Sequence, residues 1–239
     1  MNKNSTLVFD IETVGEDFDQ MDETTQEVLT SWIRKTSADD EEYKVKLAEL
    51  KDGMGFSPLT GQVIAIAMLD YEKNKSAVYF QAPGEQYGEF EENGAKFKQM
   101  DEAEMLSAFW NVSKLYSNFV TFNGRGFDVP FLNIRSAVHK IRPSKNLMSN
   151  RYLTSQDYEA KHIDLYDQLS YYGASRGKGS LHLYTRAFGI ESPKDGGIKG
   201  EDVAEFFKNN KYLEIAKYNV RDIKATGELY KIWKDLVAF

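Results

Sequence analysis

The segment from Thr6 to Glu12 restricts the possible folds of this chain more than any other segment. It reads Thr-Leu-Val-Phe-Asp-Ile-Glu, a short apolar run with β-branched residues that is typical of a strand buried in a sheet. Successive side chains of a strand point to opposite faces, so Asp10 and Glu12 share one face. Two ionised carboxylates side by side repel each other, and their burial costs free energy unless they are paired or bind a metal. The segment therefore predicts either a metal site or the solvated end of an edge strand.

The segments that follow predict the fold class. Strand-like runs and helical periodicity alternate along the chain, with strands expected at 63–69, 77–81, 119–122 and 161–164, and helices at 102–116, 128–139, 181–188 and 212–236. Turn residues between the second and third strands predict antiparallel neighbours, and residues 84–99 are interpreted as a polar loop. This order indicates a mixed α/β sheet with helices on its faces.

Residues 14–60 differ from the rest of the chain in charge. From Asp10 to Asp52 the chain has 14 acidic and 5 basic residues, and two stretches, 24–35 and 39–50, have helical periodicity with polar faces. A glycine-containing loop at 53–58 ends this region. We interpret it as an acidic, mostly helical insertion on a single domain that spans residues 1–239, and its sequence assigns it no function.

The composition excludes several classes of protein. A net charge of −7 argues against a protein that coats nucleic acid through a basic face, although bound metal ions can reverse the charge of a carboxylate site. The chain has neither an apolar run of about 18 residues nor the layout of a secretory signal, so we expect no membrane partner. Cysteine is absent, which excludes disulfides and thiolate zinc sites and is compatible with the cytoplasmic location that we expect.

Two further acidic residues occupy positions that suit a site. Asp128 follows a strand and a glycine-rich turn, where open α/β sheets place ligands, but it would also serve as the cap of the next helix. Asp222 lies four residues after Tyr218, so the two share a helix face, either in a site or as a surface polar pair. The three histidines have no partner at metal-binding spacing and are interpreted as structural.

Together these segments resemble the DEDD superfamily of 3'-5' exonucleases. Its three motifs, Asp-x-Glu, Asn-x3-Phe-Asp and Tyr-x3-Asp, match Asp10–Glu12, Asn123–Asp128 and Tyr218–Asp222 in the right order, 118 and 94 residues apart. The second motif has the form found in the proofreading domain of family B DNA polymerases. Lys217 occupies the position at which the other branch has histidine, so the resemblance is to the tyrosine (DEDDy) branch. The connecting segments resemble a stand-alone family of predicted exonucleases related to that polymerase domain.

The resemblance implies a fold and a chemistry. The fold is ribonuclease H-like, with a five-stranded mixed sheet flanked by helices and a helical insertion after the first strand. The activity is hydrolysis of phosphodiester bonds from the 3' end of single-stranded DNA by two divalent ions, Mg²⁺ or Mn²⁺. The implied catalytic residues are Asp10, Glu12, Asp128 and Asp222 as metal ligands and Tyr218. We expect Tyr218 to orient the attacking water, because an unperturbed pKa near 10 makes it a poor base.

Candidate substrate contacts are Asn123, Arg142, Lys145 and Lys199. Residues 135–161 contain six basic and two acidic residues interleaved with tyrosines, which suits a single strand whose bases stack on aromatic rings. A solvated loop explains the same residues equally well. Phe127, in the second motif, is interpreted as a core residue.

Two other functions stay open at this point. Related members of the superfamily process RNA 3' ends, and nothing in the motifs forbids a 2'-hydroxyl group. A non-catalytic nucleic-acid-binding scaffold is the third interpretation, although a scaffold has no reason to keep buried like charges together. No polymerase domain follows the third motif within the 239 residues. We therefore expect a role in DNA repair or proofreading, alone or with a polymerase or repair partner in trans.

Overall fold

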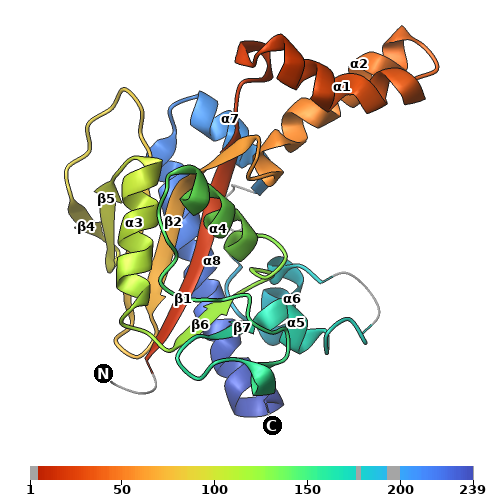
Figure 1. Cartoon of the computed structure of the whole chain (residues 1–239). Coiled ribbons are helices and arrows are strands. Elements are labelled where there is room, and N and C mark those ends of the chain that lie inside the picture. The colour runs from red at the N-terminus through yellow and green to blue at the C-terminus, as the bar shows by residue number, and fades with distance from the viewer. Residues whose placement is uncertain (1–4, 176–178, 193–199, 239) are drawn as a thin grey trace.

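One mixed sheet of seven strands runs through the part of the chain that the structure, a computed structural model, describes: residues 5–175, 179–192 and 200–238 (Figure 1). Its strand order is β4-β5-β3-β2-β1-β6-β7. The strands are β1 (Thr6–Gly15), β2 (Gly61–Asp70), β3 (Lys75–Phe80), β4 (Phe90–Glu92), β5 (Ala95–Gln99), β6 (Asn118–Thr121) and β7 (Lys161–Asp164). β1 pairs antiparallel with β2 and parallel with β6, so the strand that carries Asp10 and Glu12 is central, and the interpretation of an edge strand is wrong.

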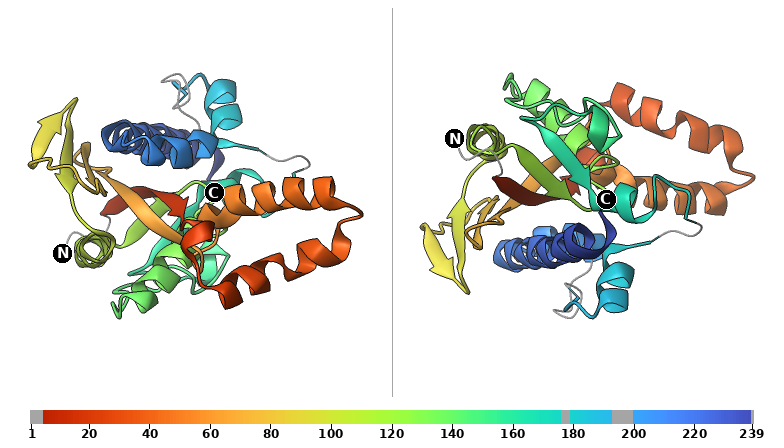
Figure 2. Two further views of the ribbon diagram at one scale, coloured as in Figure 1. Left: turned by 90° about the horizontal axis from the view of Figure 1, so that it is seen from above. Right: turned by 90° about the horizontal axis from the view of Figure 1, so that it is seen from below.

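Helices cover both faces of this sheet (Figure 2). They are α1 (Glu23–Thr36), α2 (Asp40–Gly53), α3 (Glu102–Ser113), α4 (Asp128–Val138), α5 (Leu165–Leu169), α6 (Leu181–Phe188), α7 (Val203–Lys208) and α8 (Tyr212–Ile232). Val8 packs with α8 in one core, and Phe9 packs with α3 and α4 in the other, as the alternation along a strand requires. No helix in the described ranges combines the length and the apolar character needed to cross a membrane.

The strand count differs from the expected five. Residues 84–99 contain the hairpin of β4 and β5, whose second strand extends the sheet by pairing in parallel with β3. Ala95 and Phe97 point into the core, and Lys96 between them is exposed. The polar-loop interpretation is therefore wrong, although Asn93-Gly94, both with positive φ, is a typical hairpin turn. β4 and β5 are so short that the charged residues on their exposed face hide the alternation of apolar and polar residues that is typical of a strand.

The helical insertion after the first strand is confirmed. Helices α1 and α2 form an arm that projects from the end of the sheet and returns to it through a short 3-10 turn, η2 (Met54–Phe56) (Figures 1 and 2). Ile33 of α1 is buried, whereas α2 has no buried residue. Few residues of the arm are buried, so its position depends on the contacts at its base.

A buried ion pair joins the helices on one face of the sheet to β2. Glu102, at the start of α3, accepts two hydrogen bonds from the Arg135 guanidinium of α4, at 2.9 and 2.7 Å, and one from the Val63 backbone N–H at 2.8 Å. His139 contacts the same carboxylate at 2.7 Å. Glu102 and Arg135 are 6% and 9% exposed, so removal of either side chain leaves the charge of the other buried without its ion-pair partner.

Replacement of Arg135 by alanine should destabilise the fold. Because the variant leaves Glu102 buried without its partner, we expect the free energy of unfolding to fall by about 3–5 kcal/mol in urea denaturation. Arg142→Ala is the matched control: this exposed arginine should cost no more than about 0.5 kcal/mol. Equal losses in the two variants would contradict the assignment.

Candidate metal centre

Three carboxylates converge on the face of the sheet that α8 covers. Strand alternation places Asp10 and Glu12 on the same face as Val8 and Val14, and α8 brings Asp222 against them. One carboxylate oxygen from each of the three residues lies within 4.8 Å of the other two. Glu12 and Asp222 are only 9% and 7% exposed, so these like charges are held together largely out of water.

A β-bulge follows directly after this pair. The register shifts between Glu12, which pairs with Ala65, and Thr13, which pairs with Val63, so that β2 has one extra residue, Ile64. Bulges bend a strand and increase its local twist. Ile64 packs in a small core with Val14 and Tyr218. The extra residue of β2 therefore supports the tyrosine beside the carboxylates.

Asp128 reaches the cluster through a gap in the sheet. β6 ends at Thr121 and pairs only with residues 6–8 of β1, which leaves the later edge of β1 open on that side. The Ile11 backbone N–H donates to Asp128 Oδ1 at 3.1 Å, and Asp128 is 3% exposed. The helix-cap interpretation is wrong, because Phe127 occupies the cap position. The carboxylate instead satisfies a backbone donor of the central strand.

The glycine-rich turn before Asp128 is fixed by a residue that sequence reasoning missed. Asp164, at the end of β7, accepts hydrogen bonds from the backbone N–H groups of Asn123 and Arg125, both at 2.9 Å. Asn123 adopts φ +64°, and a Cβ on Gly124 would lie 2.3 Å from Thr121 Oγ1. The fold itself thus requires glycine at position 124, because a side chain there would collide with Thr121. The position of an aspartate at the end of a predicted strand was the available signal.

Asn219 is a second residue that sequence reasoning missed. It is fully buried on α8, and its Nδ2 donates to Asp10 Oδ2 at 2.7 Å. This hydrogen bond occupies one oxygen of the Asp10 carboxylate and leaves the other for an ion. The signal was its place directly after Tyr218 in the third motif, but nothing in the sequence indicates which carboxylate it reaches.

Burial and mutual repulsion raise the pKa values of the cluster. Burial is the main cause for Asp10, whose pKa is raised well above its usual value and raised further by Asp128, Asp222 and Glu12. The pKa of Glu12 is raised by burial and then by Asp222 and Asp128. Burial raises the pKa of Asp128 to about 7, against the opposing effect of its backbone hydrogen bonds. Without a cation the cluster therefore retains protons near neutral pH, and a divalent cation bound there would displace them.

Tyr218 lies beside the carboxylates as a protonated phenol. Burial raises its pKa far above 10, and the nearby charges of Asp222, Glu12 and Asp10 raise it further. Tyr218 and Asp222 are each 7% exposed, so the interpretation of a surface polar pair is wrong. At neutral pH this hydroxyl can donate a hydrogen bond and cannot act as a base.

The histidines have hydrogen-bond partners of their own. His162 is 1% exposed, and its ring nitrogens contact Thr121 Oγ1 at 2.8 Å and the Leu147 carbonyl at 3.0 Å. His139 contacts Glu102, and His182 contacts Ser192 Oγ at 2.7 Å. Each histidine therefore has a hydrogen-bond partner within the protein, and its structural role stays a prediction.

Among the described residues, none of the candidate substrate contacts forms a hydrogen bond or an ion pair with a carboxylate of the cluster. Asn123 and Arg142 are exposed, and Lys145 Nζ donates to a backbone carbonyl at 2.8 Å. Within the basic segment 135–161, Arg135 and Arg151 already form ion pairs with acidic residues. Fewer positive charges of this segment are therefore available to bind a phosphate. Lys199 lies outside the described residues.

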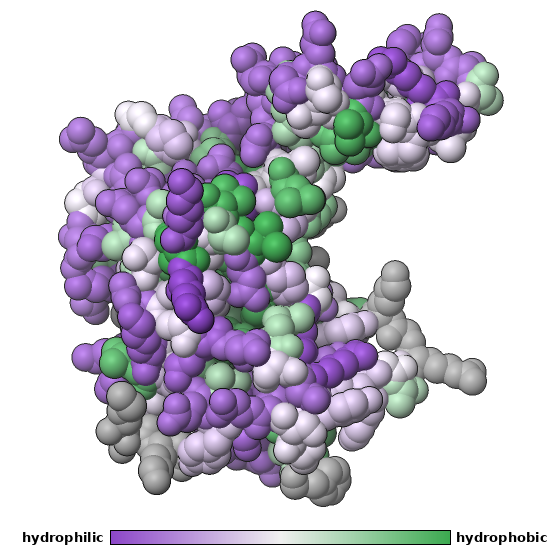
Figure 3. Space-filling model, in the orientation of Figure 1, coloured by the Kyte–Doolittle hydropathy of each residue, from purple (hydrophilic) through white to green (hydrophobic). Residues whose placement is uncertain are grey.

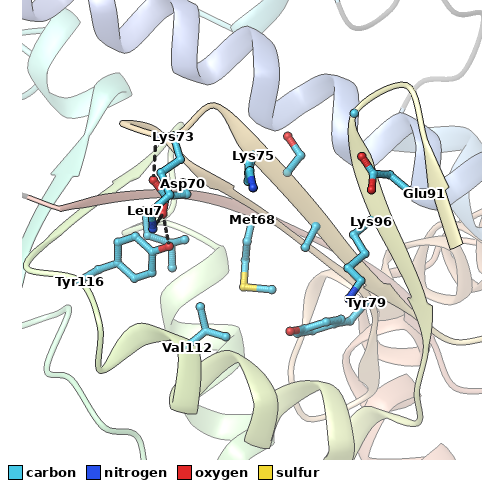
Figure 4. A pocket seen from close by; sticks show the side chains of 13 residues that line it. Leu7, Met68, Asp70, Lys73, Lys75, Tyr79, Glu91, Lys96, Val112 and Tyr116 are labelled. Carbon is cyan, nitrogen blue, oxygen red and sulfur yellow. Dashed lines mark hydrogen bonds and ion pairs between the residues drawn. The ribbon is translucent and has the colours of Figure 1, made fainter. Parts of the chain in front are cut away.

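Two pockets lie apart from the cluster. One, of about 470 Å³, lies over the sheet beside α3 (Figure 4). Within it, Tyr116 and Lys73 both donate to Asp70, at 2.9 and 2.7 Å. The other, of about 510 Å³, runs along α8 and includes Lys217 and Arg221. We assign the site to the carboxylates, because strongly perturbed pKa values are a better indication of chemistry than cavity volume.

Comparisons with known proteins give a family and a similar fold. A family described as predicted 3'-5' exonucleases related to the exonuclease domain of PolB matches residues 59–235, a range that includes Asp128, Tyr218 and Asp222 but not β1. The solved family B DNA polymerase from the hyperthermophilic archaeon Pyrobaculum calidifontis is similar in structure, with a TM-score of 0.59 and 16% identity. The match covers 96% of this chain and 24% of that chain, and at such low identity it concerns the fold alone. The search of curated proteins found no match.

Binding of Mn²⁺ should depend on pH. Asp128, with its pKa raised to about 7, has to lose its proton before it can bind a metal ion. The apparent affinity for Mn²⁺ should therefore increase about tenfold between about pH 6 and about pH 8 in calorimetric titrations. Without metal, the stability of the fold should change with pH in the opposite direction to the metal affinity. The folded state binds more protons than the unfolded state between about pH 4 and about pH 7, so the contribution of Asp128 to the free energy of unfolding decreases as pH rises through that window. An Mn²⁺ affinity that does not change with pH would contradict this assignment.

Loss of the Asn219 side chain should weaken metal binding. In Asn219→Ala the Asp10 carboxylate loses the donor that orients it, and we expect the Kd for Mn²⁺ to rise about 10- to 100-fold. Thr226→Val removes a buried polar group one turn beyond Asp222 and serves as the control. The orienting role fails if Mn²⁺ binds the two variants equally well.

Proposed function

The chain belongs to the family of predicted 3'-5' exonucleases related to the exonuclease domain of PolB, and from this membership we propose that it removes nucleotides from the 3' end of single-stranded DNA with two divalent metal ions. The observation that carries the proposal is the convergence of Asp10, Glu12 and Asp222 within 4.8 Å, with Asp128 at the adjacent edge of β1. Buried like charges at this density cost free energy unless a cation neutralises them.

The chemistry of the donor set fits Mg²⁺ or Mn²⁺. Both ions prefer oxygen ligands, and the cluster offers carboxylates without histidine or cysteine. Two such ions would stabilise the attacking and leaving oxygens of an in-line displacement at phosphorus. Asp10, Glu12 and Asp222 would hold the ions directly, and Asp128 would help to fix one of them through its water ligands.

Tyr218 would orient the water that attacks the phosphate. Its raised pKa keeps the phenol protonated, so it acts as a donor that fixes the direction of attack. Asn219 would keep the Asp10 carboxylate in place through its hydrogen bond to Oδ2. Neither residue needs to exchange a proton with the substrate.

We assign DNA rather than RNA as the substrate, because the second motif, Asn123 to Asp128, has the form found in family B DNA polymerases. The family to which the chain belongs is described as related to the exonuclease domain of PolB. We further propose that the protein acts in repair or proofreading, alone or with a polymerase or repair partner in trans. The single-domain organisation and the cytoplasmic location stay predictions from the sequence.

Digestion of a 5'-labelled single-stranded DNA oligonucleotide tests the proposal. With Mg²⁺ or Mn²⁺ the wild type should give a ladder that shortens from the 3' end. Asp10→Ala and Asp222→Ala should each lower the rate at least about 100-fold, because each removes a charge that holds the ions. Tyr218→Phe should lower kcat about 100-fold while the metal-induced rise in Tm is kept.

Tyr230→Phe is the matched control for Tyr218→Phe, since it removes the hydroxyl of another buried tyrosine of the same helix. It should leave the rate unchanged. Faster digestion of an RNA of the same sequence would shift the assignment to RNA 3' ends. No cleavage of either polymer by folded wild-type protein with either metal would leave the binding scaffold as the function.

A further inference from the structure

The base of the arm is fixed to the strand that carries the carboxylates. Thr13 Oγ1 donates to the Gly55 carbonyl of η2 at 2.7 Å, and Thr60 Oγ1 donates to the Met54 carbonyl at 2.8 Å. The backbones touch at Gly15, where a Cβ would lie 3.0 Å from Gly55 N and 2.8 Å from Met54 Cβ. The turn η2 therefore has little freedom to move relative to β1.

This fixed turn presents one aromatic side chain to solvent. Met54 is 3% exposed and holds the turn to the core, whereas Phe56, two residues later, is 68% exposed. The Phe56 ring lies edge-on to Phe127, with ring centroids 6.3 Å apart and an angle of 63° between the planes. Phe127 directly precedes Asp128, so Phe56 is connected to the carboxylate site both through β1 and through the second motif.

The projecting arm overhangs an open recess. Figure 3 shows this recess below the arm, and in Figure 1 the base of the arm, where η2 lies, is at its upper margin. The arm itself is acidic, with more acidic than basic residues from Asp22 to Asp52. Phosphates would be repelled along it, so contact between the arm and a nucleic acid has to come from the bases.

We propose that Phe56 is a stacking platform for one base near the 3' end of the single strand. An aromatic face binds every base without regard to its identity, which suits an enzyme that removes nucleotides in succession. A rigid turn makes such a contact favourable, because little conformational freedom is lost when the base binds. The proposal rests on the proposed function and adds one substrate contact, at the base of the arm.

Removal of the first 3' nucleotide, measured at increasing oligonucleotide concentration, tests the platform. Phe56→Ala should raise KM about 5- to 150-fold with little change in kcat, the range expected for one stacked base. Phe56→Tyr, which keeps an aromatic face, should stay within about threefold of the wild type. Leu115→Ala is the matched control: Leu115 is 67% exposed, at the end of α3 near the amino end of β1, and its loss should have no effect.

Oligonucleotides with a single abasic position among the last four nucleotides separate stacking from a structural role. At the position that stacks on Phe56, the abasic substrate should already show the higher KM, and Phe56→Ala should add nothing to it. An alanine effect that is the same for every abasic substrate, or a variant as active as the wild type on the intact oligonucleotide, overturns the platform and leaves the exonuclease assignment standing. A wild type that cleaves no nucleic acid overturns both.

Discussion

Repulsion between carboxylates held largely out of water is the constraint to which the rest of this structure is fitted. A central strand supplies two of them, a buried helix supplies the third, and the fourth fills the place where a neighbouring strand has ended. Asp10 accepts a hydrogen bond from the neutral amide of Asn219, and Asp128 accepts one from the Ile11 backbone N–H. Such supports fix the geometry without neutralising the charge, and a bound divalent cation would neutralise it.

The supports form a second layer around the cluster. Asp164 holds the turn that precedes Asp128, and the Glu102–Arg135 pair ties the far half of α4 to β2. These groups are buried and strongly hydrogen-bonded, so the helix that carries Asp128 is held along its length. A site that has to position ions within a fraction of an ångström needs such rigidity, because small displacements of a ligand weaken binding.

The arm changes the surroundings of the site and leaves the sheet intact. It leaves β1 just after the bulge and returns to β2 through a turn bonded to β1 itself. An insertion at this point can alter access to the carboxylates without shifting them, because the core that places them lies in the sheet and α8. Chain length added in an exposed segment also costs little closure entropy.

Much of this could be predicted from the sequence. Local spacing determined the strand with Asp10 and Glu12 on one face, the shared helix face of Tyr218 and Asp222, the helical insertion and the α/β class, because backbone periodicity is a local property. Tertiary structure alone decided which donors meet these carboxylates: Asn219 lies 209 residues from Asp10, and Asp164 lies 41 from Asn123. It also decided that Arg135 and Arg151 are paired with acidic residues and that residues 90–99 extend the sheet. Spacing within a motif specifies a face, whereas partners distant in sequence are brought together only by packing.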